Sequence, residues 1–396
     1  MLLFFLEILQ NFAQVKLPLV FYYCSTRMLL AALTTLVVTI VAGPWFIAKL
    51  FSLKTGQSIR VEDCPLLAQL HEKKKNTPSM GGLLMLFAIL ISAFLWMDLT
   101  SSFTLILIVT TLWLGILGGI DDYLKMRYKN SKGLKGKYKF LLQCLLATGL
   151  ALYLFVPGCS EVFHGGRWFA PPIAKDPSGQ LLSLSQYQGL FYLPFKKAPL
   201  FILTGGGLFL AYFIALFVVT GTSNAVNLSD GLDGLASGLI LMVAAVLASV
   251  AFLSNHQEIS KYLHILYIEG SGEIAIFLCA VFGACLGFLW YNGYPAQVFM
   301  GDVGSISLGG LLGVSAVLLR KEFLLALVGI VFVAEALSVM LQVVSFKFRR
   351  GKRIFLCAPL HHHFEYKGWP ETKVVARFWI VGLIFALLGL ASLKFQ

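Results

Sequence analysis

Residues 224–238, NAVNLSDGLDGLASG, place two carboxylates, Asp230 and Asp233, in a glycine-rich turn between two long apolar segments. An ionisable side chain beside a membrane-length apolar segment is costly to keep there, and by default it marks a functional site. Two further acidic stretches have the same setting, GGIDDYLK at 118–125 and FMGDVGS at 299–305. The repeated pattern predicts a protein of membrane spans whose connecting loops carry the chemistry.

The composition points to the same class. Hydrophobic residues make up 58% of the 396 residues and charged residues 13%, whereas a soluble domain carries roughly 25% charged residues. Several apolar windows of about 20 residues are long enough to cross a hydrocarbon core of roughly 30 Å. We therefore expect an all-α polytopic membrane protein that forms a single integral membrane domain over residues 1–396. The seven cysteines show no Cys-x-x-Cys spacing, which favours small apolar packing residues over a metal or redox site.

The hydropathy pattern predicts about ten transmembrane helices. They are 28–50, 80–97, 103–120, 140–156, 200–220, 235–253, 274–290, 306–319, 323–346 and 376–393. Residues 1–23 are predicted to precede them as an interfacial or re-entrant segment, and residues 157–199 to form a polar insertion. An even number of spans places both termini on one side of the membrane and divides the loops into two sets.

Lysine and arginine gather in one of these two sets of loops. They include Lys73, Lys74 and Lys75, six residues between 125 and 137, and five between 347 and 353. The net charge of +12 therefore indicates contact with anionic lipid and a fixed orientation, not a nucleic-acid partner. The positive-inside rule predicts that this face is cytoplasmic and that 157–199 is periplasmic. Every acidic motif and the histidine run PLHHHFE at 359–365 fall on the same predicted face.

The acidic residues are candidates for holding a divalent cation. A single Asp at a helix end is often an N-cap, and both Asp233 and Asp302 precede a predicted span. The adjacent Asp121 and Asp122 are harder to explain in this way, because neighbouring carboxylates repel unless a cation or a lysine neutralises them. Carboxylates with few thiols favour a hard cation, most simply Mg²⁺.

Positive charge for a bound pyrophosphate is available on the same face from Lys74 or Lys75, Lys125 and Lys137. Carboxylates, a metal and lysines together indicate phosphoryl transfer. The sequence has no Walker A or kinase glycine-loop pattern, which disfavours ordinary ATP chemistry.

The histidines at 361–363 admit a zinc site or a phosphate contact. Consecutive side chains of a regular helix or strand cannot all reach one metal, which favours contact with phosphate or substrate. Phe299 lies three residues before Asp302, so its ring is either an interfacial aromatic or a stacking surface for a nucleobase. The pattern alone leaves both interpretations of Phe299 open.

Five motifs, in order along the chain, resemble one enzyme family. They are TPSMGG at 77–82, GGIDDYLK at 118–125, NLSDGLDGLA at 227–236, FMGDVGS at 299–305 and APLHHHFEYKGWPE at 358–371. Together they are similar to the phospho-N-acetylmuramoyl-pentapeptide transferase branch of the polyprenyl-phosphate N-acetylhexosamine-1-phosphate transferase superfamily. HHHFE followed by KGWPE is typical of this branch. Ser79 and Ser229 stand where threonine is usual, and both keep the hydroxyl.

The resemblance implies an activity and a setting for it. Undecaprenyl phosphate would attack the β-phosphate of UDP-N-acetylmuramoyl-pentapeptide, giving lipid I and UMP in the first membrane step of peptidoglycan synthesis. The resemblance also implies Mg²⁺, a ten-helix fold in the bacterial inner membrane, an active site facing the cytoplasm, and a homodimer. The alternatives are a UDP-N-acetylglucosamine phosphotransferase of the same superfamily and, in another class, a secondary transporter. A transporter is disfavoured because the acids lie at span ends on one face.

The resemblance assigns roles by motif position. Asp302 resembles the Mg²⁺ ligand, and Asp121 and Asp122 resemble the family's paired carboxylates, with Asp121 the better candidate to deprotonate the lipid phosphate. The positions that resemble substrate contacts are Lys74, Lys125, Lys137, Asn227, Asp230, Asp233, Asn292, Phe299 and Ser305, with Phe299 stacking on uracil. His361 is assigned a catalytic role and His362 and His363 substrate contact, while the histidine that touches phosphate is left open.

Overall fold

The computed structural model describes residues 19–53, 74, 77–128, 133–155 and 172–394. Within this part of the chain the fold is helical apart from five two-residue strands, and eight helices are long and apolar enough to cross a membrane. The predicted class, an all-α polytopic membrane protein, is confirmed, and the division into ten spans stays a prediction. Several predicted features lie outside the described residues: 1–18, Cys64, Lys73, Lys75 and 156–171.

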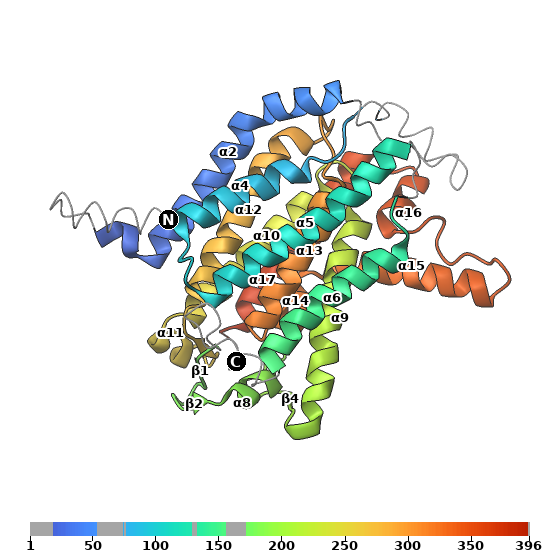
Figure 1. Ribbon diagram of the computed structural model, residues 1–396. Helices are drawn as coiled ribbons and strands as arrows, with labels where there is room; N and C mark the ends of the chain where they lie inside the picture. Colours follow the sequence, from blue (N-terminus) through green and yellow to red (C-terminus); the bar gives the residue numbers. More distant parts are fainter. Residues whose placement is uncertain (1–18, 54–73, 75–76, 129–132, 156–171, 395–396) are drawn as a thin grey trace, which may run out of the picture.

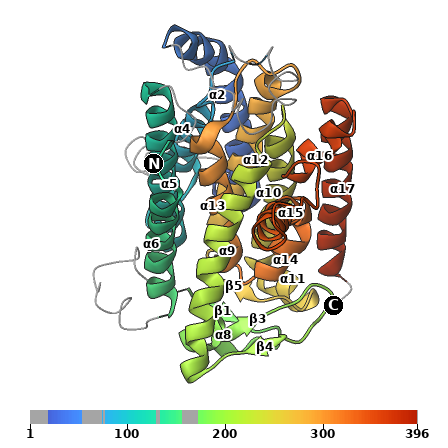
Figure 2. The ribbon, with the colours of Figure 1, turned by 90° about the vertical axis from the view of Figure 1, so that its right-hand side faces the viewer.

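The helices form one elongated bundle (Figures 1 and 2). In its first half they are η1 (Leu19–Tyr22), α2 (Cys24–Ser52), α4 (Gly82–Trp96), α5 (Ser102–Tyr128), α6 (Gly136–Phe155) and α9 (Leu208–Ser229). In its second half they are α10 (Leu235–Ser254), α12 (Gly272–Asn292), α13 (Gly301–Leu318), α14 (Glu322–Val328), α15 (Ile330–Phe348), α16 (Leu360–Tyr366) and α17 (Glu371–Ser392).

The centre of the bundle is α13. Every residue of α13 is buried except Asp302, and the helix packs chiefly against α9 and α5. Small residues make this packing close: a Cβ on Gly309 would lie 2.8 Å from the carbonyl oxygen of Thr222 on α9. Membrane helices associate through such close approach, because lipid supplies no hydrophobic force between them. The glycine-rich character of this segment therefore places it in the core.

The segment predicted as one span, 323–346, is interrupted at Gly329, between the end of α14 and the start of α15. Glycine is the weakest helix former after proline, so a change of direction is least costly there. In Figure 2, α15 is seen end-on while α9 and α17 run up the page. Figure 1 shows α15 leaving the bundle and ending in a projecting turn.

One end of the bundle, the sheet end, is covered by short strands. These and the neighbouring short helices are β1 (Ala174–Lys175), β2 (Leu181–Leu182), α8 (Leu184–Gly189), β3 (Leu190–Phe191), β4 (Phe201–Ile202), η4 (Gly205–Gly207), α11 (Gln257–Tyr262) and β5 (Tyr267–Ile268). Strand β1 pairs antiparallel with both β2 and β5, with Ala174 opposite Leu182 and Ile268, and β3 pairs antiparallel with β4. The described part of the predicted insertion therefore folds against the connector between α10 and α12.

A buried arginine fastens these strands to the bundle. Arg320, in the turn after α13, donates to the carbonyl oxygens of Gln188 at 2.8 Å and Leu190 at 3.3 Å. Its guanidinium also pairs with Glu322 at 2.9 Å and stacks on the ring of Phe191, 4.4 Å from the centroid. The far end of α13 is thereby fixed, while its Asp302 end faces the opposite side of the bundle.

Candidate active site

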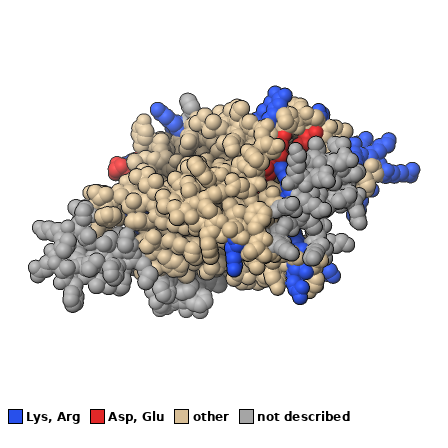
Figure 3. Space-filling model, turned by 90° about the horizontal axis from the view of Figure 1, so that it is seen from above, with Lys and Arg blue, Asp and Glu red and all other residues tan. Residues whose placement is uncertain are grey.

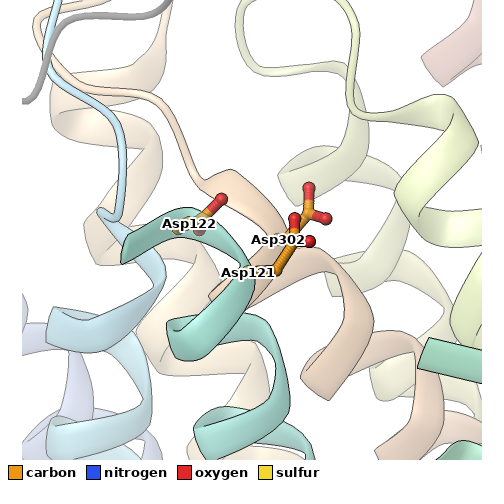
Figure 4. A group of neighbouring side chains, drawn as sticks. All are labelled: Asp121, Asp122 and Asp302. Carbon is orange, nitrogen blue, oxygen red and sulfur yellow. The ribbon is translucent and has the colours of Figure 1, made fainter. Parts of the chain in front are cut away.

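Three carboxylates converge where α5 ends and α13 begins (Figure 4). Asp121 and Asp122 are buried and Asp302 is partly exposed, and each offers an oxygen within 4.8 Å of the others. Glycine permits this approach, because a Cβ on Gly118 would lie 2.5 Å from the carbonyl oxygen of Asp302. Two helices far apart in the sequence thus bring their acidic ends together.

Asp122 has a structural role within this cluster. Its Oδ2 accepts the backbone N–H of Val303 at 3.0 Å, and so satisfies one of the free donors at the start of α13. Gly301, at φ +73°, makes the turn into α13, and a Cβ there would lie 2.5 Å from the same oxygen. The carboxylate that caps the start of α13 is therefore Asp122 of α5, not Asp302 as the N-cap interpretation would have it. The side chain of Asp302 is left free to face the site.

Two lysines neutralise part of the negative charge. Lys125 Nζ lies 2.7 Å from Asp121 Oδ2 and 3.0 Å from Asp302 Oδ1, and Lys139 Nζ lies 2.8 Å from Asp121 Oδ2 and also contacts Asp302. Three carboxylates against two ammonium groups leave one negative charge uncompensated. An all-oxygen donor set with surplus negative charge fits a hard divalent cation.

Lys139, not the predicted Lys137, contacts the cluster. Lys137 is exposed, with Nζ 5.1 Å from the centroid of the Tyr138 ring. The missed signal is helical spacing: Lys139 lies four residues before Gln143, which is buried and donates to Ser223 of α9 at 3.0 Å. Residues four apart share a helix face, so Lys139 faces the bundle as Gln143 does.

The turn between α9 and α10 adds polar groups to the cluster. Asn227 Nδ2 donates to Asp302 Oδ1 at 3.1 Å and to Ser305 Oγ at 2.9 Å. Burial, together with the negative charges of Asp302 and Asp122, raises the pKa of Asp230 to about 8. The raised pKa of Asp230 reflects how closely the acidic groups gather at this end of the bundle.

A second ion-pair group joins three connectors. Lys74 Nζ lies 2.6 Å from Asp233 Oδ1 and 2.5 Å from Glu371 Oε1, and the same Glu371 oxygen accepts the N–H of Asp233 at 2.8 Å. The other Asp233 oxygen accepts the N–H of Ala296 at 2.9 Å. Glu371 was missed because a glutamate in the first turn of a helix is an ordinary favourable residue there.

Asn292, the last residue of α12, and Phe299, in the connector between α12 and α13, flank this group. Asn292 is buried; its Oδ1 accepts the N–H of Gly234 at 3.0 Å, and its Nδ2 donates to the carbonyl oxygen of Val298 at 2.9 Å. The backbone of Phe299 pairs with Pro78 and Gly81, both at 2.8 Å, while its ring is half-buried. Stacking on a base therefore stays a prediction.

The three histidines of α16 have different surroundings. His361 is fully buried, and its Nδ1 lies 3.2 Å from Glu335 of α15. His362 pairs with Glu365 at 2.7 Å. His363 Nδ1 accepts the N–H of Leu356 at 3.1 Å, in keeping with the neutral form, because burial and the charge of Lys367 lower its pKa.

The other ring nitrogen of His361 lies beside the NLSDGLDGLA motif. A Cβ on Gly231 would lie 2.3 Å from His361 Nε2, so the turn carrying Asp230 lies against this ring. Glu335 is not among the predicted site residues, although an acid within an apolar span is the signal that should have found it.

Comparison with known proteins identifies the family of the chain. The family model for glycosyl transferase family 4 matches residues 104–320. The chain is 58% identical over all of its length to the phospho-N-acetylmuramoyl-pentapeptide-transferase of Protochlamydia amoebophila, which it also covers entirely. It is 47% identical to the enzyme of the same name from Thermodesulfovibrio yellowstonii, with 95% of each chain covered, and 46% identical to that of Francisella tularensis, with 94% of each covered. The chain belongs to the phospho-N-acetylmuramoyl-pentapeptide transferase family.

Proposed function

We propose that this membrane transferase moves phospho-N-acetylmuramoyl-pentapeptide from its UDP carrier to undecaprenyl phosphate, forming lipid I and releasing UMP. The observation that carries the proposal is the convergence of Asp121, Asp122 and Asp302 with two lysines at one end of a membrane bundle. Family membership supports the transferase chemistry. The relatives' name supports the sugar-peptide as the group transferred.

Asp302, with Asp121 and Asp122 beside it, would hold the Mg²⁺ ion. When bound, the ion would neutralise charge on the pyrophosphate and polarise its oxygens. Lys125 and Lys139 already lie among these carboxylates, so their ammonium groups are placed to contact phosphate oxygens as well. Bringing two anionic substrates together is the costly part of the reaction, and clustered cations lower that cost.

The transfer step requires little proton movement. A phosphate monoester has a second pKa of about 6 and is mostly dianionic at neutral pH. An oxygen of the lipid phosphate forms a bond to the β-phosphorus as the bond from that phosphorus to the bridging oxygen breaks, and UMP leaves. Asp121 is the proposed acceptor for any remaining proton, because its buried carboxylate lies between both lysines.

Replacing Asp121 by asparagine tests that role. Asp121→Asn should lower turnover about 10²-fold, the usual contribution of a positioned base, while the dissociation constant for UMP stays unchanged. Turnover is followed by UMP release and nucleotide affinity by calorimetry. Near-normal turnover in this variant would remove the base role of Asp121 without affecting the assignment of Asp302 as the metal ligand.

The proposed substrate contacts outside the aspartate cluster lie around the ion-pair group of Lys74, Asp233 and Glu371. Lys74, Asp233 and Asn292 would position the nucleotide, with Phe299 against uracil and the histidines of α16 near the phosphates. The basic loops on this end support an active site facing the cytoplasm of a bacterial inner membrane. A homodimer is proposed from the family resemblance, and light scattering of the purified protein tests it.

The decisive assay is UMP release from UDP-N-acetylmuramoyl-pentapeptide in the presence of undecaprenyl phosphate. UMP should appear only with both substrates, stop with EDTA and resume when Mg²⁺ is restored. UDP-N-acetylglucosamine is the matched control donor. Equal or faster release from that donor would identify the other branch of the superfamily and overturn the proposal.

A further inference from the structure

The end of α15 and the turn after it form an unusually basic surface. Five residues make up this basic tip: Lys347, Arg349, Arg350, Lys352 and Arg353. All five are exposed, and the sequence contains no Asp or Glu between Glu335 and Glu365. Seen from above in Figure 3, basic side chains gather at the right-hand end, the side toward which α15 projects in Figure 1.

The positive charge of the basic tip is not balanced locally. None of its five residues forms an ion pair with any residue in the described ranges. The side-chain contact that Arg353 makes is with a neutral group, the carbonyl oxygen of Leu356 at 3.3 Å. Such a concentration of exposed cations beside a membrane helix is typical of a segment that contacts anionic lipid.

Exposed apolar side chains flank the cations on both sides. Phe346 precedes the cations and is 54% exposed, and Phe348 lies between Lys347 and Arg349 and is 76% exposed. Ile354 and Leu356 follow the cations, and each is 49% exposed. Apolar groups beside lysines and arginines are typical of segments that lie at the boundary between headgroups and acyl chains. The combination fits a lipid surface better than a soluble anion, which would leave these four side chains in water.

The basic tip is a folded turn, not a loose tail. Gln342 Oε1 accepts the N–H groups of Ile354 at 3.1 Å and Phe355 at 3.0 Å, and Ser345 Oγ donates to the carbonyl oxygen of Lys352 at 2.9 Å. The turn continues into Leu356, whose N–H donates to His363. Charges needed only to orient the protein during insertion would not require this fixed arrangement.

We propose that the basic tip is a binding surface for the headgroups of anionic phospholipids of the phosphatidylglycerol type. The guanidinium and ammonium groups contact the lipid phosphates, and the four apolar side chains enter the acyl boundary. The backbone N–H of Leu356 is hydrogen-bonded to His363. Lipid bound at the basic tip therefore holds helix α16, which carries the histidines, at the membrane surface.

Native mass spectrometry of the purified full-length protein, titrated with phosphatidylglycerol or with phosphatidylcholine, tests the proposal. The test variant is Arg349→Gln/Arg350→Gln. The matched control, Lys196→Gln/Lys197→Gln, removes the same charge from exposed lysines at the sheet end. Loss of about fivefold in affinity per cation is expected, so the dissociation constant for phosphatidylglycerol should rise about 25-fold in the test variant alone. Phosphatidylcholine binding should not change in any protein.

A second double variant, Lys352→Gln/Arg353→Gln, guards against a local folding defect and should behave as the first does. Retention of phosphatidylglycerol by both tip variants would overturn the proposal, as would an equal loss in the sheet-end control. A titration with undecaprenyl phosphate completes the test. If the tip variants lose that lipid and keep phosphatidylglycerol, the surface is a substrate contact and the proposal is wrong.

Discussion

The two ends of the bundle both bury charged side chains, but they balance them differently. At the sheet end, Arg27 pairs one-to-one with Glu273 at 2.8 Å, and Arg320 divides its donors between Glu322 and two backbone carbonyls. At the aspartate end, three carboxylates share two lysines. Buried charges that only support a fold are paired and hydrogen-bonded. The surplus of carboxylates at the aspartate end is typical of a site that binds a cation.

The largest expected effect comes from removing Asp302. Asp302→Ala should lower turnover by at least about 10³-fold, because it removes a proposed metal ligand and the carboxylate that both lysines contact. UMP release measures turnover, and calorimetry with Mg²⁺ measures cation binding. Glu258→Ala, at an exposed acid of α11, is the control and should be neutral. Activity within tenfold of the parent would show that the unequal charge has no catalytic meaning.

Glu335 should have the next largest effect, although it lies within a span. Glu335→Gln keeps the shape and removes the charge that faces His361 Nδ1, so the ring should lose its fixed orientation. Partners of this kind typically contribute 10–100-fold to the group that they orient. Turnover should fall by about that factor, with a shifted pH–rate profile and unchanged thermal stability. Loss of stability with a normal profile would instead assign Glu335 to the fold.

The sheet end should respond in the opposite way. Arg320→Gln leaves the Glu322 carboxylate buried without its partner, which should lower the free energy of unfolding by about 3–5 kcal/mol. The turnover of the protein that remains folded should be unchanged. Thermal unfolding and UMP release per folded molecule measure the two quantities. A selective loss of turnover would mean that the two ends do not divide stability and activity between them.

The smallest effect expected is a pH dependence that Asp230 imposes on stability. Its pKa is raised to about 8 in the folded protein, against about 4 in the unfolded chain. Between these values the folded state binds the extra proton, so the free energy of unfolding falls as the pH rises and levels off above about 8. Asp230→Asn should make the profile less steep over this range. Thermal unfolding in Mg²⁺-free buffer checks this, and identical slopes would contradict it.

Much of the fold could be predicted from the sequence, because hydropathy and charge are local properties. The apolar windows near α5, α10 and α12 are long enough to be identified as membrane spans from the sequence alone. The break at Gly329 could not be placed in this way, because a glycine in an apolar span is compatible with a continuous helix. Whether the chain turns there depends on what α14 and α15 pack against.

The candidate site likewise contains some residues that the sequence predicts and others that only the structure shows. Motif spacing identified Asp121, Asp122 and Asp302 as candidates, and the structure brings them within reach of one another. The choice of Lys139 over Lys137 and the contact from Glu371 depend on how α6 and α17 are rotated and packed. Those rotations are set by packing against helices distant in the sequence, α9 for α6 and α10 for α17.

The sequence by itself determined the membrane class and the acidic and basic motifs, since each depends on a short run of residues. Only the tertiary structure decided which charges meet, because a distance such as that from Lys74 to Glu371 results from the packing of the whole bundle. The unequal balance at the aspartate end follows from that packing. No count along the chain reveals it, because the basic loops fall on the same face as the acidic motifs.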